Sequence, residues 1–147
     1  DLETAIIYPG MCLIEGTNIS EGRGTPSPFK YIGAPWIDGI QLSQKLNKLN
    51  LPGVVFIPKS FIPKSIPGKS ENPKHNKIKC EGVEIQITNR NTYKSVKTGV
   101  IMIFTLYEMN KEKIIFHEKH LNRLWGNNNL LKSIRSGQSV DMFLSGL

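Results

Sequence analysis

The alternation of apolar and polar residues along the chain predicts three strands. Short apolar runs at residues 11–15 and 54–57 are each typical of a buried strand. At residues 83–88, valine and isoleucine alternate with polar residues, which indicates a strand with one face toward solvent. These three segments would supply the strands of a small sheet.

Apolar residues at helical spacing predict helices between and after those strands. The first helix is expected at residues 40–49 and the longest at residues 95–109. Two shorter helices follow at residues 117–124 and 128–136, the second capped by Gly137. This order of strands and helices predicts an α/β fold in which a small mixed sheet is packed with helices.

Length and composition are those of one globular domain covering residues 1–147. A chain of 147 residues with 39% hydrophobic residues can bury a core without a disulfide or metal. Two cysteines, Cys12 and Cys80, exclude a disulfide scaffold. The longest apolar run, residues 99–106, is far shorter than the roughly 20 residues that span a bilayer, so no membrane span is predicted. Because the first residue is Asp1 rather than Met, we expect a processed chain or a part of a longer protein.

Most of the positive charge lies in a Pro/Lys-rich loop predicted at residues 58–79. The whole chain has 19 basic and 12 acidic residues, a net charge of +7, and this loop holds six of its lysines against the single acid Glu71. Four prolines exclude a regular helix or a central strand there, and the motif Phe-Ile-Pro-Lys-Ser occurs twice in tandem. The loop is either a solvated lysine-rich segment or a surface that lies against an anionic polymer.

The segment at residues 15–26 is the strongest candidate for a binding or catalytic site. It places Glu15, Glu21 and Arg23 among three glycines and several hydrogen-bonding side chains, directly after the first predicted strand. Ligand sites gather such groups on loops at strand ends. The alternative is a structural turn in which Arg23 pairs with one of the two glutamates.

The same region carries a resemblance to a known family. It resembles the C-terminal part of the bacterial exo-β-N-acetylmuramidases, long known only as a domain of unknown function. The segments that carry the resemblance are YPGMCLIEGTN (8–18), SEGRGT (20–25) and IGAPWID (32–38), continued by LNLPGV (49–54), CEGV (80–83) and VKTG (96–99). The repeat in the loop at residues 58–79 departs from the pattern expected for that family.

The resemblance implies a glycoside hydrolase that releases terminal N-acetylmuramic acid from the non-reducing end of peptidoglycan fragments. It further implies an N-terminal Rossmann-like domain, absent from this chain, with the active site in the cleft between the two domains. This chain would form one wall of that cleft and would be inactive alone. The resemblance also implies an extracytoplasmic or secreted bacterial protein.

Within that function, the sequence offers candidate residues for each role. Glu15 and Glu21 are the candidate catalytic residues, because most glycosidases place two carboxyl groups about the scissile bond, and Glu21 could instead accept hydrogen bonds from sugar hydroxyls. Arg23 is the candidate partner of the lactyl carboxylate that distinguishes muramic acid from glucosamine. Candidate contacts to hydroxyl or acetamido groups, or to a sugar face, are Thr17, Asn18, Ser20 and Trp36. Trp36 fits the core equally well, and Glu15 fits a structural ion pair.

Other chemistries find less support. The two histidines His117 and His120 lack the spacing and the glutamate of a zinc helix, so no metal is predicted, and no motif for a cofactor is present. Clustered lysines alone attract any nucleic acid without specificity, so no specific nucleic-acid partner is expected. The remaining alternative is a non-catalytic module that binds cell-wall glycan.

Overall fold

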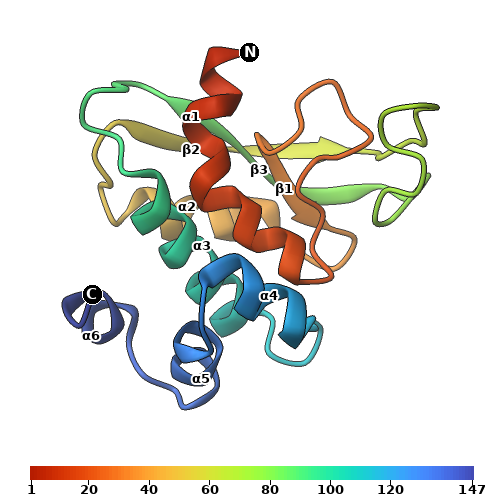
Figure 1. The fold of residues 1–147 in the computed structure, drawn as a ribbon. Coiled ribbons are helices and arrows are strands. Elements are labelled where there is room, and N and C mark those ends of the chain that lie inside the picture. Colours follow the sequence, from red (N-terminus) through yellow and green to blue (C-terminus); the bar gives the residue numbers. More distant parts are fainter.

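The three strands form one antiparallel sheet in the order β1-β3-β2. The computed structural model describes residues 1–147, with strands β1 (Tyr31–Ala34), β2 (Val54–Phe61) and β3 (Cys80–Ile87). The combination of helices with a sheet confirms the predicted α/β class. The prediction of a mixed sheet is wrong, because both neighbouring strand pairs are antiparallel. In Figure 1 the strands run across the upper part of the molecule, with helices beneath and in front of them.

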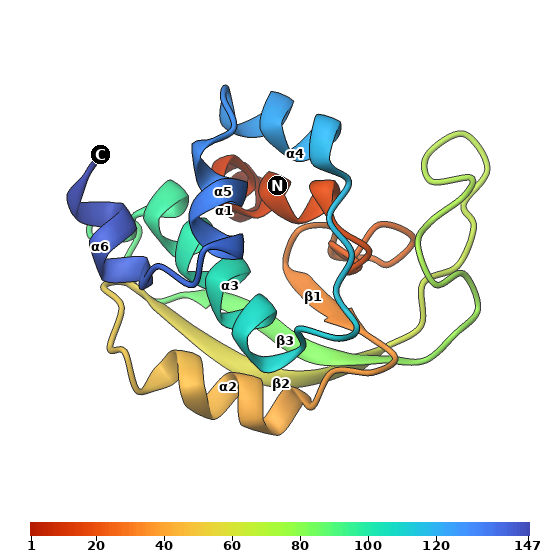
Figure 2. The same ribbon diagram turned by 90° about the horizontal axis from the view of Figure 1, so that it is seen from below.

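Three helices cover one face of this sheet. They are α1 (Leu2–Met11), α2 (Gly39–Asn47) and α3 (Ser95–Met109). Apolar residues from all three share one core cluster with strand residues such as Phe56 and Ile85. On the opposite face, Gln86 is exposed, as the alternation in the sequence predicted for β3. Figure 2 shows α2 beside β2 and α1 on the side of β1.

A second layer of helices packs on α3. The short helices α4 (Glu118–Trp125), α5 (Asn129–Arg135) and α6 (Val140–Ser145) form a second core cluster with α3 residues. Because α3 lies between the two clusters, nine consecutive residues from Thr98 to Leu106 are buried. No helix of the chain combines the length and apolar character needed to cross a membrane.

Helices α2 to α5 confirm the four predicted helices, at residues 40–49, 95–109, 117–124 and 128–136. The strand predicted at residues 11–15 is wrong. Those residues complete α1 and form a short 3-10 helix, η1 (Cys12–Gly16). Pro9 lies inside α1 and removes one backbone donor, and the run of four apolar residues from Met11 to Ile14 does not distinguish a strand from a buried helical turn. Helices α1 and α6 and strand β1 were not predicted.

Helices α1 and α3 meet backbone to backbone. A Cβ atom at Gly10 would overlap the carbonyl oxygen of Ser95, and one at Gly99 would overlap the carbonyl oxygen of Gly10. The Gly10 amide also donates to Ser95 Oγ at 2.9 Å, and that hydroxyl donates to the carbonyl of Ile7 at 3.0 Å. This close crossing fixes the direction in which the chain enters η1.

Strand β2 continues into the segment that was predicted to be a loop. The strand ends at Phe61, so the loop begins at Ile62 rather than at Pro58. Pro58 is tolerated because β2 is an edge strand, where a backbone donor is dispensable. Phe56 lies two residues before Pro58 on β2, and the side-chain amide of Asn47, at the end of α2, bonds both of its backbone groups. It accepts from the Phe56 N–H at 2.9 Å and donates to the Phe56 carbonyl at 2.8 Å.

Candidate functional site

The 3-10 helix η1 places Glu15 at the start of the candidate site. η1 follows α1 directly, and its last residue, Gly16, packs against Leu121 of α4 so closely that a Cβ atom would lie 2.7 Å from Leu121 Cβ. The Glu15 side chain is 18% exposed, and its Oε1 atom is buried without a hydrogen-bond partner. Glu15 therefore has an acceptor atom that the fold leaves unused.

The loop that follows is held by its own polar side chains. Thr17 Oγ1 donates to the carbonyl of Ile14 at 2.8 Å and accepts from the amide of Ile19 at 3.0 Å. Ser20 Oγ accepts from the amide of Gly22 at 3.0 Å. The backbone of Ser20 also forms an isolated bridge to β1. Both hydroxyls are buried and serve the loop itself.

Asn18 ties the loop to the segment between α3 and α4. Its side-chain amide donates to the carbonyl of Lys113 at 3.0 Å, and its Oδ1 accepts from the amide of Ile115 at 2.9 Å. A backbone bridge between Thr17 and Phe116 continues the contact. All hydrogen bonds of the Thr17, Asn18 and Ser20 side chains are thus to backbone groups of the protein.

Four charged side chains converge beside this loop, and we refer to Glu15, Glu21, Arg23 and Lys74 as the polar cluster. Arg23 Nε lies 3.2 Å from Glu21 Oε1, and Arg23 Nη2 lies 3.6 Å from Glu15 Oε1. The other oxygen of Glu21, Oε2, accepts from Lys74 Nζ at 2.9 Å. The structure thus brings together three predicted site residues, Glu15, Glu21 and Arg23. It adds Lys74, which was not predicted as a site residue.

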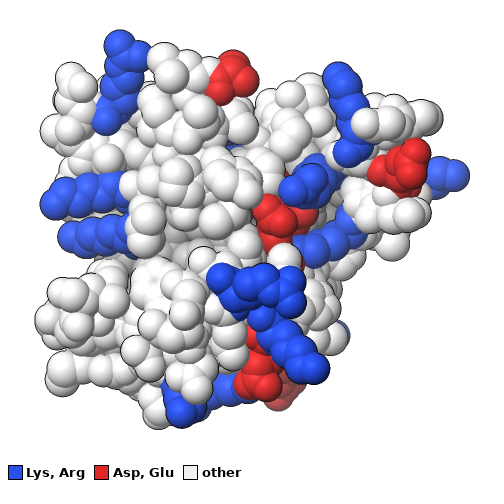
Figure 3. Space-filling model, in the orientation of Figure 1, with Lys and Arg blue, Asp and Glu red and all other residues white.

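Burial differs sharply within the polar cluster. The Glu21 side chain is 5% exposed, whereas that of Arg23 is 44% exposed. A buried carboxylate is stable only when it is paired and hydrogen-bonded, and Glu21 has a cation at each oxygen. Both oxygens of Glu21 are therefore occupied by Arg23 and Lys74. The side chains of Arg23 and Glu15 remain partly exposed to solvent. Figure 3 shows acidic and basic side chains lying next to one another on the face in view.

Lys74 and His75 come from the lysine-rich loop and were missed in the sequence. Lys74 Nζ also donates to the carbonyls of Ile14 and Ile19 at 3.1 and 3.0 Å, and His75 Nε2 lies 2.7 Å from the carbonyl oxygen of Asn18. In Figure 1 the loop projects beside the residue 17–30 segment. No signal in the sequence separates Lys74 from the other lysines of the loop.

Gly24 marks the place where the two loops touch. Its φ of +85° is strained for other residues, and a Cβ there would lie 2.8 Å from the carbonyl oxygen of Lys64 and 3.0 Å from Pro73 Cβ. The Lys64 amide donates to the Gly24 carbonyl at 2.9 Å. A glycine is thus required for the lysine-rich loop to dock.

Cys12 lies near the polar cluster, and the charge of Glu15 affects the pKa of its thiol. The thiol donates to the carbonyl of Pro9 at 3.3 Å. Burial, and then the Glu15 carboxylate, raise the pKa of the Cys12 thiol above its ordinary value. A thiol with a raised pKa is less often a thiolate at neutral pH, so Cys12 is less nucleophilic than a free cysteine.

Trp36 lies apart from the polar cluster. It is partly buried against the main core and lines an open hollow of about 620 Å³ with Asp38, Pro58 and Glu81. None of the polar cluster lines this hollow. The structure therefore does not bring Trp36 together with the other predicted site residues.

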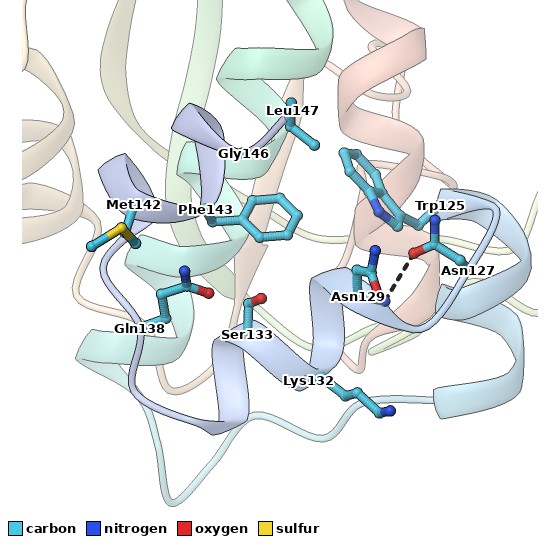
Figure 4. Close-up of a pocket in the computed structure, with 10 residues that line it drawn as sticks. All are labelled: Trp125, Asn127, Asn129, Lys132, Ser133, Gln138, Met142, Phe143, Gly146 and Leu147. Carbon is cyan, nitrogen blue, oxygen red and sulfur yellow. Dashed lines mark hydrogen bonds between the residues drawn. The ribbon is translucent and has the colours of Figure 1, made fainter.

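Another hollow, of about 420 Å³, lies among the last three helices. Figure 4 shows Trp125 and Phe143 on its wall, with the Asn127 side chain accepting from the Asn129 amide at 2.8 Å. None of the predicted site residues lines it. No three His, Cys, Asp or Glu side chains anywhere in the chain come together as a metal site.

Comparison with known proteins identifies the family of this chain. Residues 6–147 match the family described as "Exo-beta-N-acetylmuramidase NamZ, C-terminal". The chain belongs to this family. Over 145 residues it is 39% identical to the peptidoglycan beta-N-acetylmuramidase NamZ of Bacillus subtilis (strain 168), an alignment that covers 98% of this chain and 33% of that protein.

Solved structures share the fold. Two crystal structures of DUF1343 family proteins from Bacteroides fragilis NCTC 9343 resemble the chain, one with a TM-score of 0.77 at 19% identity and one with 0.67 at 26% identity. The matches cover 89% and 97% of this chain but 34% and 35% of those chains. The NamZ-family chain described here thus spans about a third of the length of its relatives.

Proposed function

We propose that this NamZ-family chain forms one wall of the active site of a glycoside hydrolase that releases terminal N-acetylmuramic acid from the non-reducing end of peptidoglycan fragments. The observation that carries the proposal is the polar cluster, in which one solvent-accessible guanidinium lies between two carboxylates. The activity named for the Bacillus subtilis relative supports the same substrate class.

Glu15 is the proposed catalytic carboxyl group of this wall. A general acid or base needs an oxygen that is free to exchange a proton with the substrate. Glu15 Oε1 is buried but accepts no hydrogen bond, and its nearest cation, Arg23 Nη2, is 3.6 Å away; the side chain as a whole is 18% exposed, so part of this carboxyl group can be reached from outside. Glu21 is less suited to proton transfer, because both of its oxygens are paired with cations. Its proposed role is to orient Arg23.

Arg23 is the proposed partner of the lactyl carboxylate. Its Nε and Nη2 atoms face Glu21 and Glu15, while Nη1 contacts no carboxylate of the chain. A guanidinium binds a carboxylate through two parallel N–H donors, and the Nη1 edge offers such a pair to a ligand. This contact would select muramic acid over glucosamine.

The other predicted contacts take different roles in this proposal. Thr17, Asn18 and Ser20 hold the loop, because all their side-chain hydrogen bonds are to the protein's own backbone. Trp36 offers a stacking face only in its own hollow.

The remaining groups of the active site would come from the rest of a longer protein. The polar cluster lines neither of the hollows described above, so a facing domain is needed to enclose a sugar. A Rossmann-like N-terminal domain, as the family resemblance implies, would supply the second catalytic carboxyl group. Since the proposed substrate is cell-wall material, we also propose an extracytoplasmic or secreted location.

A chimera tests the proposal. This chain replaces the matching third of the Bacillus subtilis relative, and turnover of a chromogenic N-acetylmuramide is measured for Glu15→Gln and, as the matched control, for the exposed and unpaired Glu112→Gln. We expect Glu15→Gln to lower kcat by roughly 100-fold or more, as loss of general acid-base catalysis does, with kcat of Glu112→Gln within twofold of the parent. An active chimera that tolerates Glu15→Gln would remove Glu15 from the mechanism.

The same chimera tests Arg23. Arg23→Met should lower kcat/KM for the muramide by roughly 10-fold or more, because a charge-assisted contact is lost. A chimera that hydrolyses nothing, although this chain binds peptidoglycan, would instead favour a non-catalytic module that binds cell-wall glycan.

A further inference from the structure

Lys74 is the residue through which the lysine-rich loop reaches the polar cluster. Its Nζ donates to Glu21 Oε2 at 2.9 Å and to the carbonyls of Ile14 and Ile19 at 3.1 and 3.0 Å. An ammonium group has three donors, and these three acceptors use all of them, with the Glu15 carbonyl oxygen as a fourth, longer contact at 3.5 Å. The Lys74 side chain is 24% exposed, so its head group is held by the protein rather than by water.

Lys74 and Arg23 contact different oxygen atoms of the Glu21 carboxylate. Lys74 takes Oε2, and Arg23 reaches Oε1 through Nε alone, at 3.2 Å. Arg23 therefore makes a single contact with the buried carboxylate, and its terminal nitrogens extend toward Glu15 and solvent.

We propose that Lys74 is a specificity-determining residue that keeps Arg23 available to the carboxylate of the ligand. The proposal rests on the function above, in which Arg23 binds the lactyl group. Without Lys74, the buried Oε2 atom of Glu21 would need another donor, because an unpaired buried oxygen is costly. A guanidinium fits both oxygens of one carboxylate, so Arg23 would turn inward onto Glu21. Lys74 touches no substrate and acts by positioning Arg23.

Lys74 is held in place because the loop on both sides of it is docked on the protein. Pro73, just before it, is buried against Gly24, and His75, just after it, contacts the Asn18 carbonyl. The backbone on both sides of Lys74 is thus docked on the residue 15–25 segment. The lysines of the loop other than Lys74 are exposed and form no ion pair with the polar cluster; they are Lys64, Lys69, Lys77 and Lys79.

Binding of two sugars to the chimera defined above, in which the facing domain is present, tests the proposal in a calorimetric titration. N-acetylmuramic acid carries the lactyl carboxylate and N-acetylglucosamine lacks it, so the ratio of their Kd values measures the contribution of Arg23. We expect the unsubstituted chimera to prefer N-acetylmuramic acid by roughly 10-fold or more, and Lys74→Met to reduce that preference below about threefold. Lys74→Met should leave the Kd of N-acetylglucosamine within about threefold, and the matched control Lys69→Met should change neither value.

A second variant separates charge sharing from general scaffolding. Glu21→Gln with Lys74→Met removes the buried charge together with its partner, so nothing draws Arg23 inward and the preference should return. This double variant also replaces Lys74→Met as the test if the single variant does not fold. A ligand-free signal comes from the side-chain NMR resonances of Arg23, whose rotation about the Nε–Cζ bond should slow in Lys74→Met when both oxygens of Glu21 are engaged.

The outcomes distinguish this proposal from the one it rests on. A Lys74→Met chimera that keeps the preference, or that weakens both sugars equally, would overturn the role of Lys74 alone, provided that Arg23→Met abolishes the preference. Loss of the preference in the double variant would also overturn it. An unsubstituted chimera without any preference for N-acetylmuramic acid would overturn the role of Arg23, and that of Lys74 with it.

Discussion

Replacing Glu21 with alanine removes the carboxylate that two cations of the polar cluster share. Breaking a fully buried ion pair from one side costs about 3–5 kcal/mol, because the other charge is left behind unpaired. Glu21 is 5% exposed, but the Arg23 and Lys74 side chains are 44% and 24% exposed, so water compensates part of the loss. We therefore expect Glu21→Ala to lower the free energy of unfolding by about 2–3 kcal/mol, which corresponds to a decrease in Tm of roughly 4–12 °C.

Urea unfolding followed by circular dichroism measures this change. Glu112→Ala is the matched control, because Glu112 is exposed and forms no ion pair, and it should change the free energy of unfolding by less than about 0.5 kcal/mol. Glu21→Gln keeps the volume and one of the two acceptor oxygens, so its effect should be smaller than that of alanine. If Glu21→Ala were as stable as Glu112→Ala, the polar cluster would not be the tightly paired unit described here.

Three further results are expected. Gly10→Ala should lower the free energy of unfolding by at least about 2 kcal/mol in the same urea assay, because its methyl group would overlap the backbone of α3, whereas Gly146→Ala should have little effect because that Cβ meets nothing closer than 3.6 Å. Glu15→Gln should speed iodoacetamide labelling of Cys12 at pH 8, since the carboxylate that helps to raise the thiol pKa is gone; an unchanged rate would contradict this. Burial raises the pKa of Cys80 to about 11, so the folded state retains a proton that the unfolded state releases above pH 9; stability should fall from pH 9 to pH 11, and Cys80→Ala should reduce that fall in urea titrations.

The sequence was informative where one kind of packing dominates a segment. Residues 95–109 were predicted to be helical, and α3 has those bounds, because apolar residues there recur densely at helical spacing. The same criterion failed at residues 11–15, because a run of only four apolar residues fits a strand, a helix end or a 3-10 turn equally well. The choice was made by contacts far away in sequence, such as that of Gly16 with Leu121.

The candidate site was only partly predictable for a related reason. Glu15, Glu21 and Arg23 lie within nine residues of one another, so their proximity follows from the chain itself. Lys74 is separated from Glu21 by 53 positions and lies among lysines of similar surroundings in the sequence. Only the docking of Gly24 on the lysine-rich loop selects it, and that contact depends on the folded backbone.

The side-chain amide of Asn47 has a consequence for how copies of this chain associate. A neighbouring strand could extend the sheet at β2 only by pairing with backbone groups that point outward, and an amide already occupies both such groups of Phe56. Two residues further on, Pro58 has no donor to offer. At the other border, the backbone of Ser20 pairs with Gly33 of β1. At these positions, neither border serves as a template for intermolecular strand addition, so fibril-like growth from the folded chain is blocked there by one asparagine, one proline and the loop that carries the polar cluster.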